Sequence, residues 1–211
     1  MREESWDHQI TDTGNNVHEN CGTRQFGGTA TMLFNHVAST VNGTGYDSSG
    51  LGRWSWTQLQ GKYGVSATII TAYCPCKSNP TSPETVYNQQ RRYLMTKNRD
   101  VCPCEAFRHN LSAFITQRVQ KGDQIILCID LNEDINRDNG PIQQTLLHSN
   151  GLTNILTHKH NFLTPATHNQ GTKTIDAIYV SPNLVDCNAT RWLPFEHGIG
   201  DHRVAFLDIN L

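Results

Sequence analysis

Two apolar, β-branched runs place the strongest constraint on how this chain folds. They are VSATIITAY at 65–73 and QIILCID at 124–130. Runs of this kind are typical of strands covered on both faces, because a strand with one face in water alternates apolar with polar residues. A chain of 211 residues is long enough to bury such strands in the core of one ordinary domain.

The segments around these strands predict helices. A helix is expected over 84–96, with Ser82 or Thr81 near its N-cap. A second helix is expected over about 103–121, where apolar residues recur every three or four positions. A short helix is expected over 140–149.

Shorter strands and loops complete the pattern. The strands are expected at 29–34, 53–60, 175–180 and 204–211. Tyr63-Gly64 predicts a hairpin turn between two of the strands. Residues 1 to about 25 predict an irregular lead-in, and the Gly-, Ser- and Thr-rich stretch 40–52 predicts a loop. This order of elements is mixed α/β rather than a strict βαβ alternation.

The charge of the chain bears on its partners. A formal net charge of -2 argues against a protein that coats duplex DNA by neutralising phosphates, since such proteins are usually basic. An enzyme needs only a local group of cations. The candidates are Arg91, Arg92, Lys97, Arg99, Arg108, Arg118 and Lys121. These residues either form such a group or are the solvated faces of two helices.

Targeting signals are not evident in the sequence. No stretch approaches the roughly 20 apolar residues that a membrane helix needs, and residues 1–10 lack the apolar core of a secretory signal. We therefore expect an intracellular protein, nuclear or cytoplasmic, that does not cross a membrane. Its oligomeric state is left open.

Seven cysteines without a secretory signal are expected to be reduced thiols. Two Cys-Pro-Cys pairs, Cys74/Cys76 and Cys102/Cys104, leave three alternatives open. Four thiolates could hold zinc, although structural zinc sites usually have wider ligand spacing and the proline restricts the turn. The pairs could also form a disulfide, or be plain loop cysteines.

Acidic and amide side chains follow the second buried run at Asp130-Leu131-Asn132. Polar residues at the C-terminal end of a buried strand lie where α/β sheets bind their ligands. The alternative is that these residues cap the following turn. The tripeptide alone does not decide between the two.

An aspartate and a histidine in later segments add to this pattern. Asp176 lies within the apolar strand TIDAIYV, where an unpaired carboxylate would be costly. Either a neighbouring backbone group satisfies it, or it orients a histidine. Asp201-His202, before the last strand, offers a metal or water contact together with a proton donor, or is simply a polar loop. His158 and His160 are weaker candidates for metal ligands.

Together these segments resemble the endonuclease/exonuclease/phosphatase superfamily. Its members share an apolar strand ending in Asp-x-Asn, a later strand carrying an Asp, and a Ser-Asp-His before the last strand. The corresponding segments here are IDLN at 129–132, TIDAIYV at 174–180 and GDHR at 200–203. The strands GGTATMLF at 27–34 and VSATIITAYCP at 65–75 also match. The nearest resemblance is to retroelement-type endonucleases, and Gly200 departs from the usual Ser.

The resemblance implies a four-layer α/β/β/α sandwich and hydrolysis of a phosphate ester with Mg²⁺ or Mn²⁺. By analogy, Asp130 aligns or activates the attacking water and Asn132 holds water or phosphate. His202 stabilises phosphoryl oxygens, and Asp176 hydrogen-bonds its other ring nitrogen. Asp201 lies near the metal or leaving group, so that Asp130 and Asp201 are the implied metal ligands. Tyr87 matches a helix tyrosine that contacts phosphate.

The resemblance also implies that an N-terminal strand-helix-strand is missing. Residues 1–24 would be a lead-in and 25–211 a partial domain, without the family's metal-binding Glu. Glu3, Glu4 and Glu19 do not follow an apolar strand, so we expect weak metal binding and weak or absent activity. The expected substrate is nucleic acid, namely DNA, cut by an endonuclease. The alternatives are a phosphodiesterase acting on lipid or inositol phosphates, and a non-catalytic binding module with the same fold.

Overall fold

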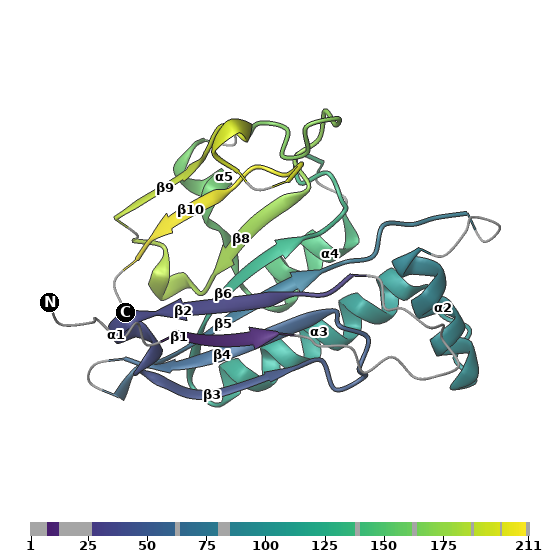
Figure 1. The fold of residues 1–211 in the computed structure, drawn as a ribbon, viewed down its shortest axis with the longest axis horizontal. Helices are drawn as coiled ribbons and strands as arrows, with labels where there is room; N and C mark the ends of the chain where they lie inside the picture. The colour runs from purple at the N-terminus through teal and green to yellow at the C-terminus, as the bar shows by residue number, and fades with distance from the viewer. Residues whose placement is uncertain are drawn as a thin grey trace, which may run out of the picture.

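The computed structural model centres on a six-stranded sheet (Figure 1). It describes residues 8–12, 27–61, 64–79, 85–137, 140–161, 164–186, 188–198 and 200–209. The strand order is β3-β4-β5-β6-β8-β7, in which β5 and β6 are parallel and the other pairs antiparallel. The strands are β3 Val41–Tyr46, β4 Trp54–Gln60, β5 Ser66–Tyr73, β6 Asp123–Asp130, β7 Thr153–Asn154 and β8 Asp176–Val180.

Among the described residues, two small antiparallel sheets and five α-helices accompany the large sheet. The small sheets pair β1 His8–Asp12 with β2 Ala30–Phe34, and β9 Ala189–Trp192 with β10 Ala205–Asp208. The helices are α1 Asn35–Ala38, α2 Val86–Thr96, α3 Pro103–Gln120, α4 Pro141–Gln144 and α5 Ile155–Lys159. A π-helical turn, Thr145–Ser149, continues α4, and 3₁₀ turns lie at Pro182–Leu184 and Phe195–His197. No helix among the described residues is long and apolar enough to cross a bilayer.

One face of the large sheet is covered by helices. Phe107, Leu111 and Ile115 of α3 pack with strand residues such as Ile70 and Leu127, all of them completely or almost completely buried. Burying each such side chain stabilises the fold by about 1.5–3 kcal/mol. This helix-covered face explains the apolar residues at alternate positions of the two central runs, and Ile69 and Ile126 of the same runs pack in the second apolar group on the opposite face.

The opposite face is covered unevenly. Helix α5 and strands β9 and β10 pack over β8 through an apolar group that includes Ile155, Ile178 and Trp192, and β1 and β2 lie over the other end (Figure 1). The mixed α/β class is therefore confirmed, with layers in the expected order of helices, large sheet and second sheet. The second sheet is split into two, and α5 contacts β8 directly as well as β9.

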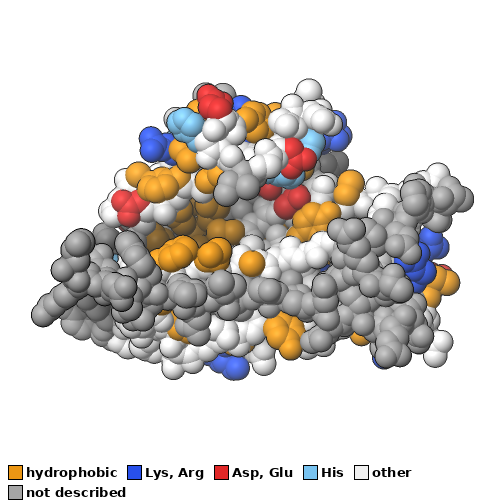
Figure 2. Space-filling view, in the orientation of Figure 1, with side chains coloured by type: hydrophobic (Ala, Val, Ile, Leu, Met, Phe, Trp, Pro, Cys, Tyr) orange, Lys and Arg blue, Asp and Glu red, His pale blue; other side chains and the backbone are white. Residues whose placement is uncertain are grey.

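A hollow of about 430 Å³ lies between β2 and β10. Figure 2 shows it as a recess with an apolar floor. Its floor is made by side chains of β5, β6 and β8, and its walls include Ala30 and Ala205. Asp130 and Asp176 line it as well. The face of the sheet that carries the acidic residues is thus open.

Several elements differ from the sequence-based expectations. Residues 40–52 were expected to be a loop, but β3 occupies Val41–Tyr46, and β1 lies within the expected irregular lead-in. The N-cap of α2 is Thr85, whose side chain accepts a hydrogen bond from the Asn88 N–H, not Ser82 or Thr81. Those two residues, and Tyr63 of the expected hairpin turn, lie outside the described residues.

Arg118 is not the surface cation that its place among the candidate basic residues suggested. Its side chain is 8% exposed, and its Nη2 lies 2.6 Å from Oδ2 of Asp123. The guanidinium also lies 4.7 Å from the centre of the Trp56 ring. The candidate basic group is correspondingly smaller, with Arg92, Lys97 and Arg99 still exposed.

The two glycines of β3 provide a test of this strand. A Cβ at Gly45 would lie 2.8 Å from ring atoms of Trp56, which is held between Arg118 and Phe114. We expect Gly45→Ala to lower the free energy of unfolding by about 1–3 kcal/mol, as overpacking does. Gly43→Ala is the matched control because its Cβ would meet only ordinary 3.6 Å contacts. Urea unfolding measures both, and equal stabilities would contradict the position of Trp56.

Candidate active site

Two strand ends bring a pair of carboxylates together. Asp130 is the last residue of β6 and Asp176 the first of β8, and the antiparallel register makes them Cα partners. Both side chains are partly buried and line the hollow. The alternation along β6 explains this direction, since Ile129 points to the helix-covered core while Cys128 and Asp130 line the other face.

His202 joins this pair from the segment before β10. Its Nδ1 lies 2.8 Å from Oδ2 of Asp176. Ligand atoms of Asp130, Asp176 and His202 all lie within 4.8 Å of one another. A carboxylate on Nδ1 holds a proton there, so Nε2 faces away from Asp176 and is left for another partner.

Asp201 and His168 form a second group on the other side of His202. His168 Nε2 lies 3.2 Å from Oδ2 of Asp201, and the rings of His168 and His202 meet edge to face with centroids 5.0 Å apart. The ligand atoms of these three residues also lie within 4.8 Å of one another. Asp201 is the most exposed member, with 62% of its side chain accessible.

Asn132 is held close to Asp130. Its backbone N–H donates to Oδ1 of Asp130 at 2.9 Å, and its side-chain Nδ2 donates to the carbonyl of Cys74 at 2.7 Å. Its φ of 51° is in the left-handed region, which Asn tolerates better than most residues. The Asp-x-Asn turn therefore holds the Asp130 carboxylate in one orientation through the Asn132 backbone N–H.

Burial and charge shift the titration of two site residues. Burial raises the pKa of Asp130 to about 6, and the nearby charge of Asp176 adds to this shift. Burial alone would lower the pKa of His202, but the hydrogen bond and charge of Asp176, with the charges of Asp130 and Asp201, outweigh it and raise that pKa. Near neutral pH the Asp130 carboxylate is therefore mostly ionised, but it accepts a proton more readily than an ordinary aspartate does.

Tyr87 is placed apart from this group. Its hydroxyl lies 3.6 Å from Sγ of Cys102, and within the described residues it does not belong to the group formed by Asp130, Asp176 and His202. Of the six residues singled out in the sequence, the structure thus brings Asp130, Asn132, Asp176, Asp201 and His202 together. Their catalytic and metal-binding roles, and that of Tyr87, stay predictions.

The comparisons with known proteins concern the fold. No protein-family model matches the chain, and no curated protein matches it by sequence. Among solved structures, a 3′-5′ exonuclease, NExo from Neisseria meningitidis, matches with a TM-score of 0.64 and 14% identity over 98% of this chain and 80% of that one. An AP endonuclease from Archaeoglobus fulgidus matches with a TM-score of 0.59 and 15% identity, over 95% and 79% of the two chains.

A third match is the endonuclease domain of TRAS1, a telomere-specific non-LTR retrotransposon, with a TM-score of 0.57 and 12% identity over 97% and 80% of the two chains. The chain shares its fold with these exonuclease and endonuclease structures. At these identities the likeness establishes the fold and not the chemistry.

Gly200, which stands where the superfamily usually has Ser, has a local structural explanation. Its φ is 89°, a conformation that glycine adopts readily and other residues adopt only with strain. A Cβ built there would meet nothing within 4 Å. The backbone angle rather than crowding therefore favours glycine.

Three further residues at this candidate site were missed in the sequence. His168 lies in a loop without a motif, and a single isolated β-bridge to His202 places it in the site. Completely buried Thr167 accepts hydrogen bonds on Oγ1 from the N–H groups of Ile175 and Asp176. Tyr73 could have been found, because it ends a strand parallel to β6 and is the Cα partner of Asp130.

Proposed function

We propose that the chain is a metal-dependent phosphodiesterase that hydrolyses nucleic-acid phosphodiester bonds as an endonuclease. The observation that carries this proposal is the convergence of Asp130, Asp176 and His202 within 4.8 Å at an open strand end. General acid–base groups must lie within such reach of one another and of a common reacting atom. The fold agrees with the proposal without establishing it.

Asp130 is proposed as the group that aligns and deprotonates the attacking water. A catalytic base works best when its pKa lies near the working pH, and burial raises the pKa of Asp130 to about 6. The Asn132 N–H, 2.9 Å from Oδ1, keeps this carboxylate in one orientation. Asn132 is thereby proposed as a positioning residue, and it can also hold water or phosphate.

His202 is proposed to stabilise the phosphoryl oxygens. Asp176 holds its Nδ1 at 2.8 Å, and the raised pKa keeps more of the imidazole protonated near neutral pH. The Nε2–H can then donate to an oxygen on which negative charge develops. Asp176 is a positioning residue in this scheme.

The donor set fits a divalent cation such as Mg²⁺ or Mn²⁺. Hard cations prefer carboxylate oxygens, and the charge of Asp176 raises the pKa of Asp130, a repulsion that a cation would relieve. Asp130 and Asp201 are the proposed ligands, from the two groups that share His202. When bound, the metal would neutralise charge on the phosphate.

Nucleic acid is favoured as the substrate by the kinds of protein that share the fold. One solved structure shows NExo from Neisseria bound to a product DNA hairpin. The TRAS1 domain is the endonuclease domain of a retrotransposon. A relation to retroelement endonucleases belongs to this proposal. Lipid or inositol phosphates remain the alternative substrates, because substrate choice on one fold lies in its loops.

Replacing His202 tests the proposal. Plasmid nicking by the purified chain is expected to require Mg²⁺ or Mn²⁺ and to stop with EDTA, and His202→Asn should lower the rate about 100-fold through loss of one charge-stabilising donor. His109→Asn is a matched control, because His109 is exposed on α3 beside Glu105. Equal rates for His202→Asn and wild type would contradict the assignment.

The substrate is tested in parallel with supercoiled plasmid, an abasic oligonucleotide, a soluble phosphodiester and an inositol phosphate. Cleavage of the nucleic acids supports an endonuclease, whereas cleavage of only the inositol phosphate overturns the substrate assignment. Metal-dependent thermal stabilisation that Asp130→Ala removes, without cleavage of any substrate, would leave a non-catalytic binding module. Glu3, Glu4 and Glu19 lie outside the described residues.

A further inference from the structure

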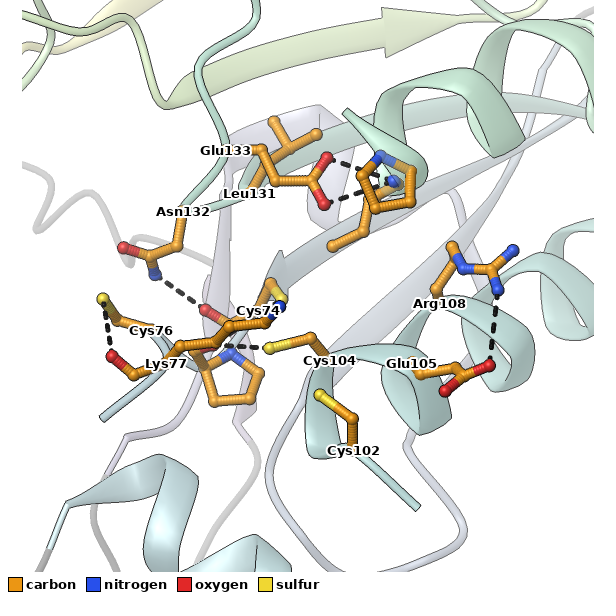
Figure 3. Close-up of a pocket in the computed structure, with 13 residues that line it drawn as sticks. Cys74, Cys76, Lys77, Cys102, Cys104, Glu105, Arg108, Leu131, Asn132 and Glu133 are labelled. Atoms are coloured by element: carbon orange, nitrogen blue, oxygen red, sulfur yellow. Dashed lines mark hydrogen bonds and ion pairs between the residues drawn. The ribbon is translucent and has the colours of Figure 1, made fainter. Parts of the chain in front are cut away.

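The two Cys-Pro-Cys pairs lie together in space, although about 28 residues separate them in the sequence. Their four thiols line a single cavity of about 560 Å³ beside the N-terminus of α3 (Figure 3). Lys77, Arg108, Asn132 and Glu133 also line this cavity. The proposed phosphodiesterase scheme does not use these thiols.

Two of the four sulfurs share one acceptor. Cys104 Sγ lies 3.2 Å and Cys74 Sγ 3.8 Å from the carbonyl oxygen of Pro75, so both thiols lie beside the same backbone group. Cys74 is 1% exposed, whereas Cys104 is partly exposed to the cavity. A reagent in the cavity therefore meets Cys104 before the more deeply buried Cys74.

The other two thiols differ in their surroundings. Cys102 Sγ contacts the Tyr87 hydroxyl at 3.6 Å. Exposed Cys76 turns toward the Lys77 carbonyl at 3.8 Å, away from the other three thiols (Figure 3). Within the described residues, no three of these sulfurs meet the 4.8 Å spacing of a metal-binding group. The arrangement favours a reactive dithiol over the zinc site considered from the sequence.

Cys104 has the electrostatic setting of a nucleophile. The hydrogen bond from Cys74 is the largest influence, and although burial opposes it, the pKa of Cys104 is lowered to about 7. Cys102 and the charge of Lys77 contribute in the same direction. A substantial fraction of Cys104 is thus thiolate at neutral pH, which is the form that reacts with oxidants.

We propose that Cys104 is an oxidation site for hydroperoxides and that Cys74 resolves it to a Cys74–Cys104 disulfide. The Cys104 thiolate attacks one peroxide oxygen, the O–O bond breaks, and the other oxygen leaves as water or an alcohol after taking up a proton. Cys104 is now a sulfenic acid. The Cys74 sulfur attacks the Cys104 sulfur, the S–O bond breaks and water leaves. Two thiols have then given two electrons to one peroxide.

The backbone of Cys74 connects this dithiol with the candidate active site. Its N–H donates to the Asp130 carbonyl at 2.9 Å, and its carbonyl accepts from Asn132 Nδ2 at 2.7 Å. A disulfide that shifts Cys74 therefore displaces the residue that holds Asn132 beside Asp130. Oxidation should thus lower phosphodiesterase activity, a consequence that rests on the proposed function while the disulfide itself does not.

Peptide mapping tests the disulfide. The fully reduced chain is treated with one equivalent of hydrogen peroxide, blocked with N-ethylmaleimide, digested with trypsin and analysed by mass spectrometry. We expect a cross-link between peptides 63–77 and 100–108, which contain the two pairs, and its reversal by dithiothreitol. Fragmentation must place it on Cys74 and Cys104; a link through Cys76 or Cys102, or no cross-link, overturns the proposal.

Variants separate the two thiols. Cys104→Ser should lower the yield of cross-link at least tenfold, and Cys76→Ser is the matched control that leaves it unchanged, because Cys76 is exposed and outside the cluster. Cys74→Ser should leave Cys104 as a sulfenic acid that dimedone labels. Circular dichroism checks that this buried substitution still folds, and if it does not, the Cys104→Ser and Cys76→Ser pair decides. If the cross-link forms but cleavage does not change, the disulfide stands and only its proposed effect on the active site is refuted.

Discussion

Asp130→Asn is expected to abolish cleavage while making the protein more stable at pH 7.5. Loss of the proposed base should lower the rate by about 1,000-fold or more. The same carboxylate is ionised in a partly buried position opposite Asp176, and burial and this charge raise its pKa to about 6. Asparagine removes the unfavourable charge but keeps an oxygen for the Asn132 N–H, so we expect a gain of about 1–2 kcal/mol in the free energy of unfolding.

The pH dependence distinguishes this gain from other causes. A carboxyl whose pKa is higher in the folded than in the unfolded state favours folding below its unfolded pKa and loses that contribution as pH rises through the folded pKa. The wild type should therefore lose stability relative to Asp130→Asn between about pH 4 and pH 7. Urea unfolding in EDTA at several pH values measures this difference. Asp100→Asn, at an exposed position, is the control, and a constant difference at all pH values would contradict the raised pKa.

Asp123→Ala is expected to destabilise the fold more than any other single change considered. Asp123 begins β6 and is 3% exposed; its carboxylate lies 2.6 Å from Arg118 Nη2 and accepts hydrogen bonds from Thr68 Oγ1 and Gln58 Nε2, each at 2.9 Å. Its loss leaves the buried Arg118 charge without this partner. Removing one partner of a buried pair typically costs about 3–5 kcal/mol.

Thermal and urea unfolding measure the effect, which corresponds to a fall in melting temperature of roughly 10 °C for a chain of this size. Asp134→Ala is the matched control, because its ion pair with Arg137 is 3.6 Å long and Arg137 is 71% exposed, and exposed pairs contribute only about 0–1 kcal/mol. Combining Asp123→Leu with Arg118→Met should restore part of the loss. If Asp123→Ala and Asp134→Ala destabilise equally, the buried network does not have this role.

The buried strands and long helices could be predicted from the sequence because their patterns are local. α3 begins at Pro103 within the expected range, and β4 pairs with β5 as the hairpin pattern indicated. β3 was missed because Gly43 and Gly45 are typical of loops, and the reason for Gly45 is the Trp56 ring above it on the next strand. That reason depends on a tertiary contact and is invisible in a local pattern.

Part of the candidate site could likewise be predicted from local sequence patterns, and part could not. Asp130 and Asp176 were found because an aspartate at the end or start of an apolar strand is conspicuous. His168 was missed because its loop has no periodicity, and only the fold brings it to His202. The phosphate contact of Tyr87 stays a prediction from the family pattern, and in the structure the tyrosine hydroxyl lies 3.6 Å from Sγ of Cys102.

The hollow between β2 and β10 also leaves two strand edges uncovered. Within the described residues, β2 pairs only with β1 and β10 only with β9. Neither strand contains Lys or Pro, the residues that commonly guard an edge against further pairing, and both carry exposed apolar side chains, Met32 and Phe34 on one and Phe206 on the other. The opening that would admit the proposed substrate to Asp130 therefore has, within the described residues, two strand edges to which a further β-strand could add.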